Sequence, residues 1–99
     1  MSNVVWKFQI VSAYETIPCT RSVGFPMGAK ILSVGIQQNG IYVWAQVDES
    51  ALEKQGIVIR NFEIYGTGQR FADTTAYKRT FIGTVFDASG DVFHIYEII

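Results

Sequence analysis

Residues 31–47 read ILSVGIQQNGIYVWAQV, two runs rich in β-branched and aromatic residues on either side of Asn39-Gly40. An Asn-Gly pair readily supplies the two positive φ angles that a type I′ hairpin turn requires. This turn sets the register of the predicted hairpin, and all the cross-strand pairs on one side are then apolar. These pairs are Ile36–Val43, Val34–Ala45 and Leu32–Val47. Turn chemistry and hydrophobic pattern therefore agree on an antiparallel strand pair.

The opposite side of this hairpin is less apolar. There the same register sets Gly35 opposite Trp44, and Gln37 opposite Tyr42. An aromatic ring that lies across a glycine covers bare strand backbone. We therefore expect Trp44 to lie across Gly35, with Tyr42 beside it on a surface that is available for binding.

Short β-branched and aromatic runs separated by turn residues continue along the whole chain, which is typical of an all-β protein. The predicted strands are 3–12, 29–37, 40–47, 57–65, 79–87 and 91–98. Segments 13–28 and 67–78 are expected to be long loops. Residues 48–56 form the one predicted helix, in which Asp48 is the N-cap, Leu52 packs inward and Gly56 ends the helix.

The chain closes with a second hairpin around DASGD, residues 87–91, where a three-residue loop places Gly90 in the left-handed region. Both faces of this hairpin are substantially apolar, which favours burial on both sides in a barrel, a sandwich or an oligomer. One face carries Phe81, Gly83, Val85, Phe93 and Ile95, and the other carries Ile82, Thr84, Phe86, Val92, His94 and Tyr96.

The first predicted strand has cleaner alternation, with Val4, Trp6, Phe8 and Ile10 on one face, and we expect it to pair with the C-terminal strand. The fold class predicted for residues 1–99 is a single all-β, mainly antiparallel domain. We expect a small sandwich or half-open barrel of about six strands with at most one short helix.

Composition narrows the classes of function. The chain has 99 residues, 17% of them charged, and a net charge of -1, which favours neither a nucleic-acid polymer nor an anionic membrane. Few charges on a small domain favour self-association or a sizeable partner surface.

One cysteine, Cys19, and one histidine, His94, make a disulfide or a Cys/His zinc site within the chain unexpected. We expect no cofactor and no metal. The N-terminus does not resemble a signal peptide and no run reaches membrane-spanning length, so we expect a soluble, cytosolic protein.

The stretch IYGTGQRF, residues 64–71, raises the question of a phosphate-binding loop. The Gly-Lys-Ser/Thr of a P-loop and the third glycine of a dinucleotide-binding fold are both missing. The pattern favours a glycine turn that ends a strand. The alternative is an anion contact through the loop amides, with Arg70 assisting.

Catalysis has little support in the sequence. His94 lies in the middle of a predicted strand and Cys19 in a predicted loop, and the interpretation favoured for both is structural. We therefore expect a protein that is not an enzyme. Most of the aromatic residues are expected in the core, namely Trp6, Phe8, Phe62, Phe81, Phe86 and Phe93. Three others are candidates for a binding surface, on which a base can stack beside arginines: Tyr42, Trp44 and Tyr65.

Several segments come in an order that resembles a known family: WKF at 6–8, PMGAKILSV at 26–34, WAQVD at 44–48, IYGTG at 64–68, FIGT at 81–84 and VFHIYE at 92–97. The chain resembles a family of small phage and prophage proteins described only as a domain of unknown function. This resemblance implies a phage setting and no catalytic residue.

In that setting we expect a non-enzymatic counter-defence protein in the host-cell cytoplasm. It would bind, as a homo-oligomer, a small phosphorylated immune signal such as a cyclic nucleotide or an ADP-ribose-like compound. The alternatives are a protein that inhibits a host defence protein by binding it, or a minor virion or assembly component. The predicted ligand-binding residues are Tyr42, Trp44, Tyr65, Gly66, Thr67, Gly68 and Arg70.

Overall fold

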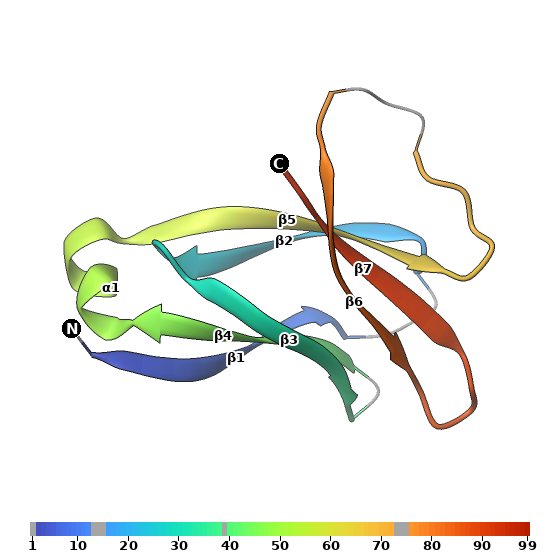
Figure 1. The fold of residues 1–99 in the computed structure, drawn as a ribbon, viewed down its shortest axis with the longest axis horizontal. Helices are drawn as coiled ribbons and strands as arrows, with labels where there is room; N and C mark the ends of the chain where they lie inside the picture. The colour runs from blue at the N-terminus through green and yellow to red at the C-terminus, as the bar shows by residue number, and fades with distance from the viewer. Residues whose placement is uncertain (1, 13–15, 39, 73–75) are drawn as a thin grey trace.

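The structure is a computed structural model that describes residues 2–12, 16–38, 40–72 and 76–99. Within these residues the chain forms seven strands and one short helix (Figure 1). In chain order they are β1 (Asn3–Val11), β2 (Cys19–Pro26), β3 (Lys30–Gln37), β4 (Gly40–Asp48), α1 (Glu49–Gln55), β5 (Ile57–Gly66), β6 (Arg79–Phe86) and β7 (Val92–Ile98).

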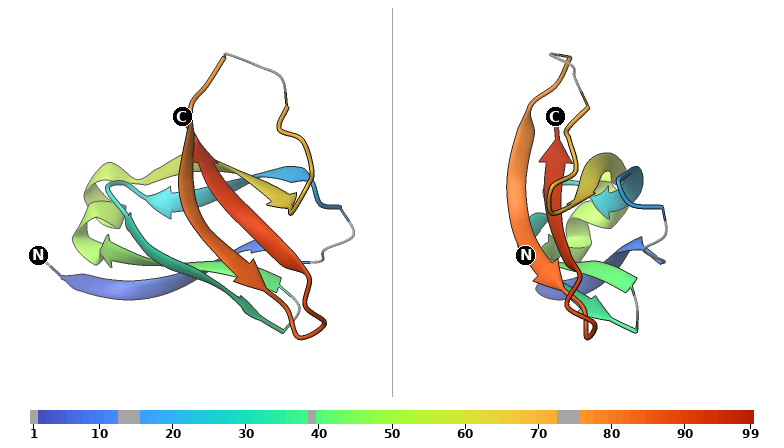
Figure 2. Two further views of the ribbon diagram at one scale, coloured as in Figure 1. Left: turned by 45° about the vertical axis from the view of Figure 1, so that its right-hand side comes forward. Right: turned by 90° about the vertical axis from the view of Figure 1, so that its right-hand side faces the viewer.

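The strands form two antiparallel sheets that face each other (Figures 1 and 2). The three-stranded sheet has the order β1-β4-β3, and the four-stranded sheet has the order β2-β5-β7-β6. The predicted all-β fold with one short helix is confirmed as a small sandwich. Over the described residues the sheets do not join into one closed, hydrogen-bonded barrel.

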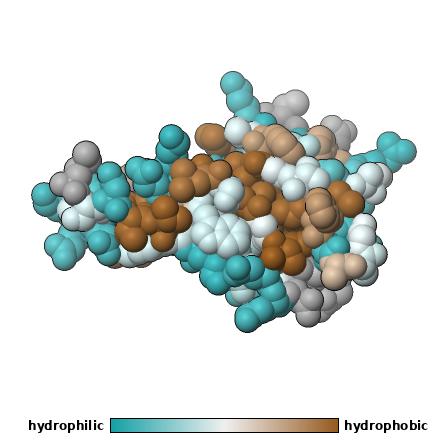
Figure 3. Space-filling view, turned by 60° about the horizontal axis from the view of Figure 1, so that its bottom comes forward, coloured by the Kyte–Doolittle hydropathy of each residue, from teal (hydrophilic) through white to brown (hydrophobic). Residues whose placement is uncertain are grey.

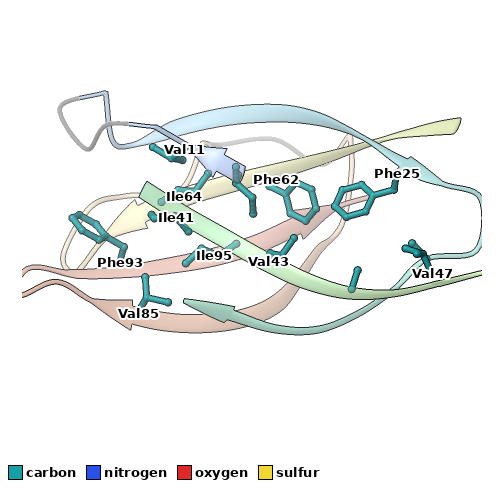
Figure 4. Close-up of a cluster of buried hydrophobic side chains, with 13 residues drawn as sticks. Val11, Phe25, Ile41, Val43, Val47, Phe62, Ile64, Val85, Phe93 and Ile95 are labelled. Carbon is teal, nitrogen blue, oxygen red and sulfur yellow. The ribbon is translucent and has the colours of Figure 1, made fainter. Parts of the chain in front are cut away.

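The core fills the space between the inner faces of the two sheets (Figure 4). Alternate residues of each strand point inward because successive side chains of a strand point to opposite faces. Thus Val43 and Ala45 of β4 meet Phe62 and Ile64 of β5, and all four side chains are fully buried. The side chains at the intervening positions, such as Trp44 and Glu63, consequently lie on the outer faces of the two sheets.

The first hairpin has the predicted faces but not the predicted register. Gln37 pairs with Gly40, and Ile36 pairs with Ile41 rather than with Val43. The two strands therefore join one residue earlier than predicted, with Gln38 at φ 50°. The predicted turn residue Asn39 lies outside the described residues. The register error is two residues, an even number, so the same residues near the turn face the core, among them Val34, Ile36 and Val43.

Two β-bulges exchange neighbouring side chains between faces, which a strict alternation does not predict. A bulge between Ile31 and Ser33 leaves Leu32 exposed, while Ile31 packs on the core. A second bulge, between Phe81 and Gly83, brings Ile82 onto the core and leaves Phe81 on the outer face. The prediction that Leu32 and Phe81 face inward is therefore wrong.

The predicted loop 13–28 contains a strand that the sequence analysis missed. Within it, β2 pairs along β5, with Phe25 opposite Val58. Its inward residues Cys19, Val23 and Phe25 alternate with polar or small ones, but Gly24 and Pro26 resemble turn residues. The first strand is also placed differently, because β1 pairs with β4 and not with the C-terminal strand.

The helix and the second hairpin agree with their predictions more closely. The Asp48 carboxylate accepts a hydrogen bond from the Ser50 amide at 3.0 Å, and Gly56 ends α1 with φ 77°. Leu52 is only half-buried, and no residue of α1 is fully buried. In the C-terminal hairpin Gly90 has φ 92°, as predicted. Val85 pairs with Phe93, which agrees with the prediction that both lie on one face.

Candidate functional site

The candidate site lies where β5 ends and the chain crosses the outer face of the four-stranded sheet. The Gln69 amide donates to the Gly66 carbonyl at 3.1 Å, which closes a tight turn with Gly68 at φ 89°. Such a positive φ favours glycine. The stretch IYGTGQRF is therefore a glycine turn at the end of a strand, as predicted.

Some of the hydrogen-bonding groups in this turn are already bonded within the protein. The Gly66 amide donates to the Gln69 side-chain oxygen at 2.6 Å, and the Gln69 side-chain amide donates to the Ile17 carbonyl at 3.3 Å. An anion held by backbone amides needs several unpaired N–H groups that converge on one point. The amides of Gly66 and Gln69 are already paired, so a ligand here depends more on side chains.

A polar network attaches the segment after the turn to the sheet. Glu63, only 2% exposed, accepts hydrogen bonds from the Tyr77 hydroxyl and from Arg79 Nε, both at 2.5 Å. Arg79 Nη2 donates to the Ala72 carbonyl at 2.8 Å, and the Ala72 amide donates to the Tyr65 hydroxyl at 3.2 Å. Both backbone groups of Ala72 are thus bound, which fixes the path of the chain over the sheet.

The charge of Glu63 is compensated within this network. Burial on its own raises the pKa of this carboxyl, but hydrogen bonds from Tyr77 and Arg79 and the charge of Arg79 outweigh it, so the pKa is lowered. Glu63 is therefore an ionised carboxylate with two donors in place. Glu63 also lines the hollow beside Arg70 that is described next. Each of its carboxylate oxygens already accepts a hydrogen bond, one from Tyr77 and one from Arg79, so we interpret this carboxylate as structural.

Two hollows flank the segment, and the rings of Tyr65 and Phe71 line both of them. The first, of about 320 Å³, is also lined by Arg70, Thr20 and Cys19. The second, of about 210 Å³, is lined by the turn, by His94 and by Tyr96. The centroids of the Tyr65 and Phe71 rings are 4.8 Å apart and the rings meet edge to face, so they form an aromatic wall that both hollows share.

The histidine and the cysteine do not form a catalytic pair. His94 Nε2 is 2.8 Å from the Thr67 hydroxyl and Nδ1 is 3.0 Å from the Thr84 hydroxyl, so both ring nitrogens have partners. Cys19 lines the other hollow. Burial raises the pKa of the Cys19 thiol, although the Arg21 charge and a hydrogen bond with Thr16 act in the opposite direction. A thiol with a raised pKa is a poor nucleophile at neutral pH.

The structure brings together five of the seven residues predicted to bind ligand. Four of these form or adjoin the turn, and the fifth, Arg70, lines the first hollow; they are Tyr65, Gly66, Thr67, Gly68 and Arg70. Tyr42 and Trp44 lie elsewhere, on the outer face of the three-stranded sheet. One chain therefore does not unite all seven in a single site, because the outer faces of a sandwich point in opposite directions.

Several residues of the site were not predicted from the sequence. Phe71 completes the aromatic wall, and Tyr96 contacts it with ring centroids 5.2 Å apart. Phe71 belongs to the stretch IYGTGQRF, and Tyr96 lies two residues after His94 on the same outer face of β7. The sequence pattern could therefore have placed both residues near the site. The pairing of Glu63 with Arg79 joins β5 to β6, and no local pattern reveals a contact of that kind.

A protein family described as "Domain of unknown function (DUF7352)" matches residues 1–99. The chain belongs to this family. No curated protein and no solved structure matches the chain. Membership of DUF7352 confirms the resemblance to a family of unknown function. Because the description of DUF7352 assigns no activity, the geometry around Arg70 has to support any functional proposal.

The described residues contain no helix with the length and the apolar character needed to span a bilayer.

Proposed function

We propose that this protein is a non-catalytic binding protein that sequesters a small phosphorylated ligand in the hollow beside Arg70. The observation that carries the proposal is the position of this arginine. Arg70 lines the hollow of about 320 Å³ together with Tyr65, Phe71 and Glu63, and the charge of Glu63 is compensated by Arg79. Over the described residues Arg70 takes part in no ion pair, whereas Arg60 and Arg79 are each bound to a glutamate.

The chemistry of this hollow suits a phosphate attached to a flat ring. A guanidinium group donates two parallel hydrogen bonds to a phosphate, which gives both affinity and orientation. The Phe71 ring, 49% exposed, offers apolar area for a base or a ribose, and the buried Tyr65 ring packs against it. Ligand pockets usually begin at about 300 Å³, so the hollow accommodates a ligand of nucleotide size or part of a larger one.

The biological class of the ligand is inferred from the phage setting that the resemblance implies. The resemblance to small phage and prophage proteins supports a counter-defence role in the host-cell cytoplasm. The ligand class is then a cyclic nucleotide or an ADP-ribose-like immune signal, which a homo-oligomer would hold without turnover. The low charged fraction of 17% supports self-association, because it leaves apolar surface to be covered.

A second candidate function, inhibition of a host protein by binding it, has one specific observation in its favour. Phe81 and Phe86, expected in the core, are 55% and 72% exposed on the outer face of the four-stranded sheet. Exposed aromatic side chains of this size are typical of protein interfaces. A role as a minor virion or assembly component would use the same surface.

Isothermal titration with ADP-ribose, cyclic dinucleotides and cyclic trinucleotides tests the proposal. At least one compound should bind, and Arg70→Ala should weaken that binding by about tenfold or more because the phosphate loses its paired donors. Lys54→Ala is the matched control, since it removes an exposed cation from α1 and should not change affinity. Equal affinity in wild type and Arg70→Ala would contradict the site, and release of a converted product would contradict a non-catalytic role.

A further inference from the structure

The outer face of the three-stranded sheet carries Tyr42 and Trp44, the two predicted residues that the Arg70 hollow does not use. The strand registers show which residues lie beside these two side chains on the neighbouring strands. Tyr42 lies between Gln9 of β1 and Gly35 of β3. Trp44, one position further along the same face, lies between Lys7 and Ser33. Two aromatic rings therefore occupy the centre of this face.

Glycines beside both rings let them lie low against the sheet. A Cβ atom built at Gly35 would be 3.2 Å from Cζ3 of Trp44, so the indole occupies the space where a side chain would stand. A Cβ atom at Gly40 would be 3.1 Å from Cε1 of Tyr42. Both side chains are partly exposed, so part of each ring is accessible from the solvent.

A lysine side chain lies over the Tyr42 ring. Lys7 Nζ lies 4.8 Å from the centre of the Tyr42 ring and donates to Gln37 Oε1 at 2.8 Å, so the lysine side chain crosses over the tyrosine. The centres of the Tyr42 and Trp44 rings are 6.5 Å apart. The tyrosine and the lysine therefore lie together beside the indole.

The polar groups around the indole are mostly uncharged. Exposed glutamines and a serine on this face offer amide and hydroxyl groups, each of which both donates and accepts hydrogen bonds. They are Gln9, Ser33, Gln37 and Gln46. The cations on the face are Lys7, which is held over Tyr42, and Lys30 opposite Gln46. A polyanion needs a continuous row of cations along its backbone, so this face does not suit single-stranded nucleic acid.

Apolar and polar side chains are mixed on this side of the molecule. Figure 3 looks onto the side where β1 and β4 run, and it shows a brown group on the left that pale side chains separate from a larger brown area on the right. Val5 and Leu32 are each about half exposed there. A protein interface would have a continuous apolar centre, whereas here amides and hydroxyls alternate with apolar groups.

We propose that this face binds a neutral carbohydrate, with Trp44 as the plate on which a sugar ring lies. The face of an indole ring is electron-rich, so it attracts the weakly positive C–H groups on the flat side of a sugar. The glutamine amides and the Ser33 hydroxyl are placed to bond the hydroxyl groups at its edge. This site is on the opposite side of the sandwich from the Arg70 hollow and does not depend on the proposed phosphate ligand.

Affinity electrophoresis in gels that contain neutral glucans, xylan or soluble chitin derivatives tests this inference, followed by titration with the matching hexasaccharide. The wild-type protein should be retarded by at least one polysaccharide and bind its hexasaccharide. Trp44→Ala should weaken binding by about tenfold or more, because a central aromatic contact is lost. Gln46→Ala, a change at an exposed side chain that leaves the fold intact, should weaken it severalfold. Arg70→Ala should bind the carbohydrate as the wild type does.

Three results would overturn the proposal. The first is the absence of retardation by every neutral polysaccharide at millimolar concentration of sugar units. The second is unchanged binding in both Trp44→Ala and Gln46→Ala, after thermal unfolding has shown that the variants are folded. The third is binding of an oligothymidylate, in place of any sugar, that depends on Trp44.

Discussion

Gly83 of β6 lies directly against Val34 of β3, so closely that a Cβ atom at Gly83 would be 2.6 Å from Cγ1 of Val34. The two strands belong to different sheets and are not hydrogen-bonded neighbours. This contact is where the edges of the two sheets approach each other, beside the bulge that follows Phe81. The absence of a side chain at residue 83 therefore allows this edge of the sandwich to close.

The variant Gly83→Ala should lose about 1–3 kcal/mol of unfolding free energy, because the added methyl group overpacks the contact with Val34. Urea denaturation measures the loss. In the double variant Gly83→Ala/Val34→Ala the clash is removed, so the two effects should be less than additive. Strictly additive losses would show that the two side chains do not meet.

Glu63 should make the folded protein less stable as pH falls into the acidic range. Its pKa in the folded protein is lowered, so the unfolded chain takes up its proton first as pH falls. The contribution of Glu63 is complete above the unfolded pKa of about 4.3, and it disappears as pH falls through the folded pKa. The wild type should therefore lose stability steeply below about pH 5.

The variant Glu63→Gln isolates this contribution. It should cost about 2 kcal/mol at pH 7, because hydrogen bonds to a charged partner are lost, and its stability should vary less with pH below 5. The pKa values of Asp48 and Asp87 are also lowered, so only the difference between the two proteins reports on Glu63. Parallel curves of urea midpoint against pH would contradict the role given to this carboxylate.

Phe86, 72% exposed, should contribute to self-association and not to folding. The variant Phe86→Ser should unfold within about 0.5 kcal/mol of the wild type, since an exposed side chain loses few contacts. Sedimentation velocity should show a smaller species for Phe86→Ser than for the wild type. Val5→Ser, which changes an exposed apolar residue on the other sheet, is the control and should sediment as the wild type does. A monomeric wild type would contradict the homo-oligomer.

The parts of the fold that could be predicted are those with local signals. The helix between Asp48 and Gly56 follows from capping residues, and the left-handed Gly90 follows from turn chemistry. The inward faces of β3 and β4 follow from alternation, even though the register of their hairpin was shifted by two residues. Trp44 does lie on Gly35, as expected, because the ring reaches diagonally across the strand.

The parts that could not be predicted depend on distant segments. β2 has only a partial alternation of apolar and polar residues, and Gly24 and Pro26 within it resemble turn residues, so its pairing with β5 is what identifies it as a strand. A β-bulge adds one residue to a strand and so reverses which side chains face inward beyond it. Amino-acid composition does not reveal a bulge, so alternation alone wrongly places Phe81 in the core. The predicted binding residues lie on two different outer faces because β4 and β5 belong to different sheets. The alternation of apolar and polar residues does not reveal which strands share a sheet.

The glutamates show the same limit. Glu63 and Glu97 interrupt apolar strands, and in the structure each is bound to an arginine, Arg79 and Arg60 respectively. The Arg60 guanidinium holds both carboxylate oxygens of Glu97, at 2.6 and 2.7 Å. A charge on an apolar strand indicates that a partner is required, but the partner lies 16 residues away for Glu63 and 37 for Glu97.

Native mass spectrometry of the purified protein, alone and with cyclic dinucleotides, cyclic trinucleotides and ADP-ribose isomers, tests the central claim most directly. The account predicts a homo-oligomer that gains the mass of one intact ligand per Arg70 hollow, unchanged over time and lost in Arg70→Ala. A protein that gains no mass from any of these compounds would contradict the proposed function.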